Sequence, residues 1–117
     1  MEKTDIHAYI LRYLQEMYNN RGLSMYAVFN GKTVPFTDVN KLINRLKNTD
    51  DTTFDSDFTK IQEIFIEVKE IEQQIQKLGN GLLTHETNGQ IYRLSQILNK
   101  KEEDIEQIVV DMLNKVN

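Results

Sequence analysis

The stretch DFTKIQEIFIEVKEIEQQIQKL (residues 57–78) carries the clearest structural signal in the sequence. Its apolar residues recur at alternating steps of three and four, which is the pattern of a helix that buries one seam against another helix. The seam residues are Ile61, Ile64, Val68, Ile71, Ile75 and Leu78. Phe58 and Phe65 widen the stripe. The pattern predicts either a long core helix of a bundle or a helix that dimerises the chain.

Four further segments have apolar residues at helical spacing. They are residues 5–20, 37–47, 89–98 and 99–115. Asn99 followed by Glu102 has the spacing of a capping box, so we expect a new helix to begin there and the last two segments to form a helical pair. The glycines at 79 and 81 are expected to end the long helix.

Residues 23–36 fit two local structures. Ser24 is a good N-cap for a short helix over 23–29. Asn30-Gly31, however, favours a two-residue hairpin turn, in which 25–29 and 33–36 would be strands. We favour the helix because of a family resemblance described below, and the hairpin stays as the alternative.

The chain length of 117 residues and a hydrophobic share of 39% suit one small domain or two very small lobes. Residues 48–56 (NTDDTTFDS) are polar and rich in turn formers, so they predict a boundary. We expect a head over residues 1–48 and a helical dimerisation or partner-binding region over residues 57–117.

The sequence shows neither a basic stretch followed by an apolar run at its start nor the ~20 consecutive apolar residues of a membrane helix. There is no cysteine, which excludes disulfides, thiolate metal sites and a cysteine nucleophile. We therefore expect a cytoplasmic protein without a membrane partner.

No catalytic constellation stands out in the sequence. His7 and His85 are isolated, so neither metal binding nor base catalysis is expected of them. The aspartates of residues 50–57 lack the glycine and terminal glutamate of a calcium loop. No phosphate loop or nucleophile motif is present. We expect a protein that is not an enzyme and has no cofactor or metal.

The stretch RGLSMYAVFNGKTVPFTDVNKLIN (residues 21–44) resembles the helix-turn-helix of Cro/CI-type phage repressors, and the resemblance extends over about residues 5–47. The matching positions are Gly22-Leu23-Ser24 at the opening, Tyr26 and Val28 on the second helix, Val34-Pro35 in the turn, and Val39 and Leu42 on the third helix. Phe29 and Thr33 replace a small residue and a glycine of the family and crowd the helix crossing. The resemblance implies a helix-turn-helix-like head. Together with the helical spacing of the remaining residues, the sequence predicts an all-α fold: a small helical bundle with this head, a long amphipathic helix and a C-terminal helical pair.

The same resemblance implies a transcriptional regulator of phage or mobile-element type that binds double-stranded DNA. The third helix would enter the major groove, and nearby basic residues would contact phosphates. The implied base contacts are Phe36, Thr37, Asn40 and Lys41. The implied phosphate contacts are Arg21, Lys32, Arg45 and Lys47. We expect a homodimer joined through the seam of residues 57–78.

The charge distribution supports an alternative. Residues 1–48 carry seven basic and four acidic residues, a net of +3, whereas residues 49–117 carry seven basic and fourteen acidic residues, a net of −7. The basic head suits a polyanion, but the acidic half suits a basic protein partner. The alternative is therefore a small non-enzymatic inhibitor or adaptor that binds a host protein. Some phage-encoded anti-CRISPR inhibitors also join a helix-turn-helix head to a helical region.

Overall fold

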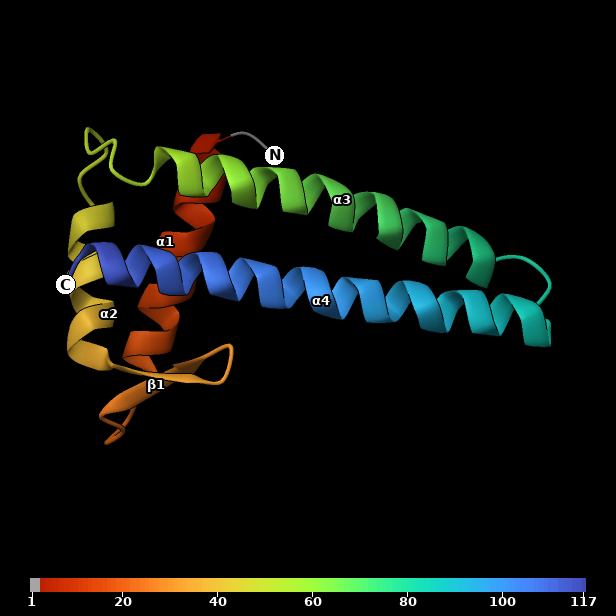
Figure 1. The fold of residues 1–117 in the computed structure, drawn as a ribbon, viewed down its shortest axis with the longest axis horizontal. Coiled ribbons are helices and arrows are strands. Elements are labelled where there is room, and N and C mark those ends of the chain that lie inside the picture. The colour runs from red at the N-terminus through yellow and green to blue at the C-terminus, as the bar shows by residue number, and fades with distance from the viewer. Residues whose placement is uncertain (1–2) are drawn as a thin grey trace.

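The structure, a computed structural model, describes residues 3–117. In this part the chain is mostly helical, with four helices and one small antiparallel sheet of two strands (Figure 1). The elements are α1 (Lys3–Asn19), β1 (Tyr26–Phe29), β2 (Lys32–Pro35), α2 (Phe36–Leu46), α3 (Asp55–Gly79) and α4 (His85–Lys115). Helical spacing therefore predicted α1, α2 and α3 to within two residues at each end.

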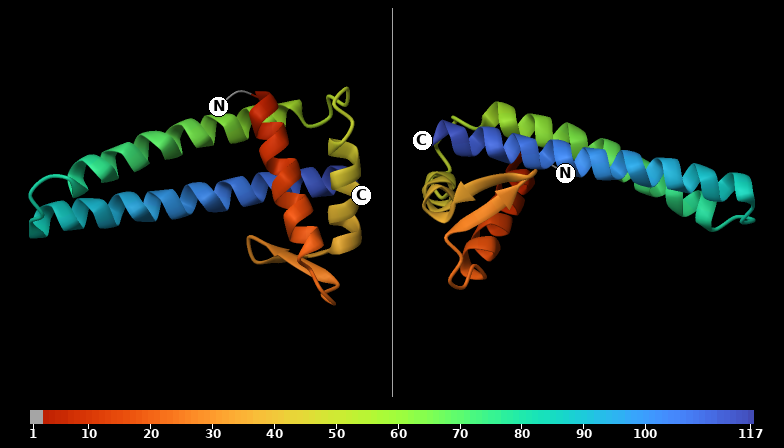
Figure 2. Two further views of the ribbon diagram at one scale, coloured as in Figure 1. Left: turned by 180° about the vertical axis from the view of Figure 1, so that it is seen from behind. Right: turned by 60° about the horizontal axis from the view of Figure 1, so that its bottom comes forward.

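The two long helices α3 and α4 run antiparallel, side by side, along the length of the molecule (Figures 1 and 2). Helix α1 crosses them near one end, and α2 and the strands complete that end. The other end is the two-helix hairpin alone, which gives the chain extents of 50 × 32 × 20 Å. No helix in the described part of the chain is both long enough and apolar enough to cross a membrane.

The hydrophobic core lies at the end where all the elements meet. It draws on both halves of the sequence, because α1, β1 and α2 bury their apolar residues against the start of α3 and the last turns of α4. The core consists of Ile6, Ile10, Leu14, Ala27, Phe29, Phe36, Val39, Leu42, Ile43, Leu46, Phe54, Phe58, Ile61, Ile108, Val109, Val110, Met112 and Leu113. None of residues 62–107, all of which the structure describes, is fully buried. We call residues 62–107 the arm.

The prediction of a second helix over residues 23–29 is wrong, and the hairpin alternative is what forms. Phe29 pairs with Lys32 across the turn, and both turn residues have positive φ, 51° for Asn30 and 75° for Gly31. Such a turn matches the twist of the two strands, and Asn-Gly is the dipeptide that adopts it most readily. The two residues therefore override the weak helical signal of a short segment.

The prediction of a helix break at Asn99 is also wrong. Helix α4 continues from His85 to Lys115, and its capping box lies at its true start: the Thr84 side chain accepts from the Thr87 N–H (3.1 Å) and the Thr87 hydroxyl accepts from the Thr84 N–H (2.7 Å). An exposed Asn costs a helix only about 0.5 kcal/mol relative to Ala. The apolar spacing before and after Asn99 is continuous, so packing on α3 outweighs that cost.

The seam of α3 packs against α4 of the same chain. Ile61 is fully buried at the core end, and the other five seam residues are half-buried along the arm. Ion pairs bridge the two helices at Lys101–Glu67 and, with 2.6 Å between Nζ and Oδ2, at Lys115–Asp57. The intrachain pairing accounts for the heptad spacing that we had assigned to a dimer contact.

We expect Lys115→Met to lower the free energy of unfolding by about 2 kcal/mol. The carboxylate of Asp57 is only 3% exposed, so removing its cation leaves a buried charge, although Lys115 itself is partly in solvent and the loss stays below that of a fully buried pair. Urea denaturation followed by circular dichroism measures the change. Lys100→Met, which breaks only the exposed pair with Asp104, is the matched control and should cost less than about 0.5 kcal/mol. Equal losses in the two variants would contradict a structural role for the Asp57 pair.

Candidate functional site

Helix α2 carries the residues that we expected to contact bases. Phe36 is only 8% exposed and packs edge-on against Tyr18, with ring centroids 6.1 Å apart. Its assignment as a base contact is therefore wrong, because the hairpin turns the first residue of α2 into the core. Thr37 and Lys41 are exposed on the outer side of the helix, and Asn40 is partly exposed between them. These three residues remain together on one surface.

Two of the four expected phosphate contacts are held by the chain itself. The guanidinium of Arg21 donates to the Tyr18 carbonyl (2.6 Å) and lies over the Tyr18 ring, 3.8 Å from its centroid. Arg45 donates to Asp51 and Thr53. Lys32, on β2, and Lys47, at the end of α2, are exposed. The basic head therefore offers less free positive charge than its sequence indicates.

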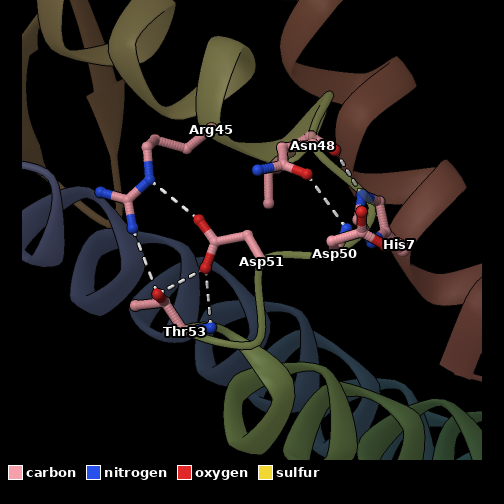
Figure 3. A network of polar contacts seen from close by, with 7 residues as sticks. His7, Arg45, Asn48, Asp50, Asp51 and Thr53 are labelled. Carbon is pink, nitrogen blue, oxygen red and sulfur yellow. Dashed lines mark hydrogen bonds and ion pairs between the residues drawn. The ribbon is translucent and has the colours of Figure 1, made fainter.

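The bonds of Arg45 belong to a polar network that fixes the loop between α2 and α3 (Figure 3). Arg45 Nε donates to Asp51 Oδ2 (3.0 Å) and Nη2 to Thr53 Oγ1 (3.2 Å), while the Thr53 N–H donates to Asp51 Oδ1 (2.9 Å). On the other side of the loop, His7 Nε2 lies 2.5 Å from the Leu46 carbonyl oxygen, and its ring stacks on Phe58. His7 thus satisfies a free carbonyl at the end of α2, which is a structural role.

The described residues contain no group of three or more His, Asp or Glu side chains placed to hold a metal ion. His85 is the first residue of α4 and is exposed.

The β-hairpin exposes a set of large apolar side chains that we did not predict. We call it the hairpin patch, and it consists of Leu23, Met25, Tyr26 and Val28. Tyr26 and Val28 are 56% and 64% exposed because strand alternation turns them outward, while Ala27 and Phe29 point into the core. The Asn30-Gly31 dipeptide was the available signal, because a hairpin turn there makes residues 26–29 a strand whose alternate side chains face outward.

A concave surface lies where α1 crosses the arm, at the end of the arm nearest the core. This aromatic groove has a volume of about 370 Å³ between α1, α3 and α4. Its lining residues are Tyr9, Ile10, Tyr13, Phe65, Val68, Glu72, Glu102, Ile105, Glu106 and Val109. The rings of Tyr9 and Phe65 meet edge to face, with centroids 5.3 Å apart. The groove thus combines an aromatic wall with three carboxylates.

The hairpin and the groove adjoin at Glu106. The N–H of Asn30, in the hairpin turn, donates to Glu106 Oε2 (2.9 Å), and the Asn30 side chain donates to Gln107 (3.1 Å). Within the groove, burial raises the pKa of Tyr13, and the negative charge of Glu106 raises it further. The Tyr13 phenol therefore stays neutral and able to donate a hydrogen bond.

Comparisons with known proteins add no relative: no family model matches the chain, and no curated protein or solved structure matches it.

The loop network predicts a specific pH dependence. The pKa of Asp51 is lowered from 3.8 to about 2, chiefly by the hydrogen bonds from the Thr53 hydroxyl and N–H and then by Arg45. A lowered folded-state pKa stabilises the fold above the unfolded-state pKa, and this stabilisation disappears as the pH falls from about 4 to about 2. The stability difference between the native chain and Asp51→Asn should therefore shrink over that interval. Unfolding in urea at a series of pH values measures it.

Asp50→Asn is the matched control, because it removes the neighbouring carboxylate, which accepts no hydrogen bond within residues 3–117. Its stability difference from the native chain should not shrink in the same way. A constant difference for Asp51→Asn would show that the network contributes nothing through the charge of Asp51.

Proposed function

We propose that this chain is a non-enzymatic protein-binding module, such as an inhibitor or adaptor, and that the hairpin patch is its docking surface. The observation that carries the proposal is the exposure of four large apolar side chains close together in the sequence, Leu23 and Met25 just before the hairpin and Tyr26 and Val28 on β1. Apolar side chains that are grouped on a surface lower the solubility of a protein, and on monomers they commonly mark an interaction site. Tyrosine and methionine are also enriched at protein interfaces.

The hairpin is held in place before any partner arrives. Phe29 anchors its inner face in the core, the Phe36 N–H donates to the Met25 carbonyl (3.0 Å), and Asn30 is bonded to α4. A pre-ordered surface loses less entropy on binding than a flexible one. This rigidity favours recognition of a folded partner with a complementary apolar surface.

The charge of the chain favours a basic partner. Residues 49–117, which comprise α3, α4 and the loop before α3, carry the net charge of −7. Complementary charge accelerates encounter and disfavours acidic competitors. The proposed partner is accordingly a basic host protein.

DNA binding by a regulator of phage or mobile-element type is the second candidate. One observation favours it: four polar side chains lie on one face of α2, of which Thr37, Lys41 and Asn44 are exposed and Asn40 is partly exposed. Amide and ammonium groups are suited to base edges, and an outer helix can enter a major groove. The exposed Lys32 and Lys47 would add phosphate contacts.

For either candidate we propose a homodimer that forms through the arm. The seam residues Val68, Ile71, Ile75 and Leu78 are only half-buried by α4. Two such two-helix arms would form a four-helix bundle that covers the seam more fully. Sedimentation equilibrium of the native chain and of Ile71→Glu tests this directly.

The docking surface is tested with the double variant Tyr26→Thr/Val28→Thr. Threonine keeps the strand propensity but removes the apolar side chains, so the fold should persist. We expect the native chain to capture one specific basic protein from host extract and the double variant to capture at least about tenfold less. Quantitative mass spectrometry of the captured material measures this.

Tyr92→Gln is the control, because Tyr92 is an equally exposed aromatic residue on α4, away from the hairpin. It should leave capture unchanged. Equal capture by all three proteins, or no specific capture by the native chain, would rule out the hairpin patch as the docking surface.

The DNA candidate predicts that the chain binds duplex DNA and that Lys41→Gln weakens this binding and reduces its salt dependence by about one counterion. Fluorescence anisotropy of labelled duplexes at several salt concentrations measures both. Lys69→Gln, on the exposed side of α3, should bind like the native chain. An absence of binding even at low salt would eliminate this candidate.

A further inference from the structure

The aromatic groove has the composition of a site for a guanidinium group. Each of the three helices contributes a short stripe to it: Glu102, Ile105, Glu106 and Val109 of α4, Phe65, Val68 and Glu72 of α3, and Tyr9, Ile10 and Tyr13 of α1. The lining thus combines apolar side chains, aromatic rings and carboxylates. A long side chain with an apolar stem and a cationic tip matches these three parts.

The carboxylates of the groove are not neutralised by the chain. Within residues 3–117, Glu72 and Glu102 have no hydrogen bond or ion pair, and Glu106 accepts only the neutral N–H of Asn30. The neighbouring lysines are used elsewhere, Lys100 by Asp104 and Lys101 by Glu67. The groove therefore has uncompensated negative charge beside an apolar surface.

The aromatic wall adds to the attraction for a cation. Tyr9 and Phe65 lie edge to face, so the two rings present a face and an edge in different directions. A cation over a ring face is attracted by the negative charge of the π-system, and more strongly when it is desolvated. The neutral phenol of Tyr13 supplies a further polar contact. Arginine suits the site better than lysine, because its planar group stacks on rings and contacts two carboxylate oxygens at once.

We propose that the aromatic groove binds an arginine side chain of the partner protein, flanked in that partner by apolar residues. The inference deepens the proposed function and rests on it only in requiring that the partner is a protein. The bond between Asn30 and Glu106 joins the hairpin turn to a residue that lines the groove. A partner that covers the hairpin patch would thus have the groove within reach.

The test uses the full chain and two synthetic peptides, acetyl-Ala-Leu-Arg-Leu-Ala-amide and the same peptide with citrulline, a neutral isostere, in place of arginine. Nuclear magnetic resonance titration follows the backbone and aromatic signals. We expect the arginine peptide to shift the signals of Tyr9, Tyr13 and Phe65 and the citrulline peptide to bind at least about fivefold more weakly. Because this comparison uses the native chain, it does not depend on whether any variant folds.

The variants Glu72→Gln and Glu102→Gln should each weaken binding of the arginine peptide by about two- to fivefold. Glu103→Gln is the matched control: it is the next residue of the same helix, exposed and outside the groove, and it should change nothing. Equal binding of both peptides, or signal shifts confined to residues outside the groove, would overturn the proposal.

The hairpin variant separates this inference from the proposed function. Tyr26→Thr/Val28→Thr leaves the groove intact and should bind the arginine peptide like the native chain. Loss of partner capture in the hairpin variant together with equal binding of the two peptides would overturn the groove inference alone. Arginine-specific peptide binding without any effect of the hairpin variant on capture would overturn the hairpin as docking surface alone.

Discussion

The packing of the last turns of α4 is the interaction on which the rest of the structure depends. Val109, Met112 and Leu113 are almost fully buried there, and α2, α3 and β1 all contact α4. Burying one such side chain contributes about 1.5–3 kcal/mol. Because the arm adds no fully buried residue, this single small core must hold both the hairpin and the base of the arm.

The sequence was most informative where apolar spacing repeats over many residues. The seam of α3 and the stripes of α1 and α2 extend over three turns or more, so small local preferences could not disguise them. Near Asn99 and in residues 23–29 the prediction depended on single caps and a short resemblance. There the Asn30-Gly31 turn and the unbroken spacing of α4 decided the outcome. A signal of one or two residues can favour either of two local structures, and the packing of the whole chain determines which of the two forms.

The candidate site was less predictable because its partners come from distant segments. Arg45 was expected to face phosphate, but Asp51 and Thr53 of the next loop bind it. Phe36 was expected outside, but the hairpin directs it inward. Tyr26 and Val28, which the resemblance placed on a second helix, instead lie on the outer face of a strand. The hairpin that forms in place of the second helix thus removed Phe36 from the expected DNA-contacting surface and created the hairpin patch.

The C-terminal half of α4 connects the groove, the hairpin turn and the core. On one helix, Glu102 and Ile105 line the groove, Glu106 and Gln107 hold the hairpin turn, and Leu113 fills the core. As built, the groove, the hairpin and the core keep a fixed spacing set by the helical rise of 1.5 Å per residue. The hairpin turn and the groove are thus ordered before any ligand binds, and a pre-ordered surface loses less entropy on binding than a flexible one.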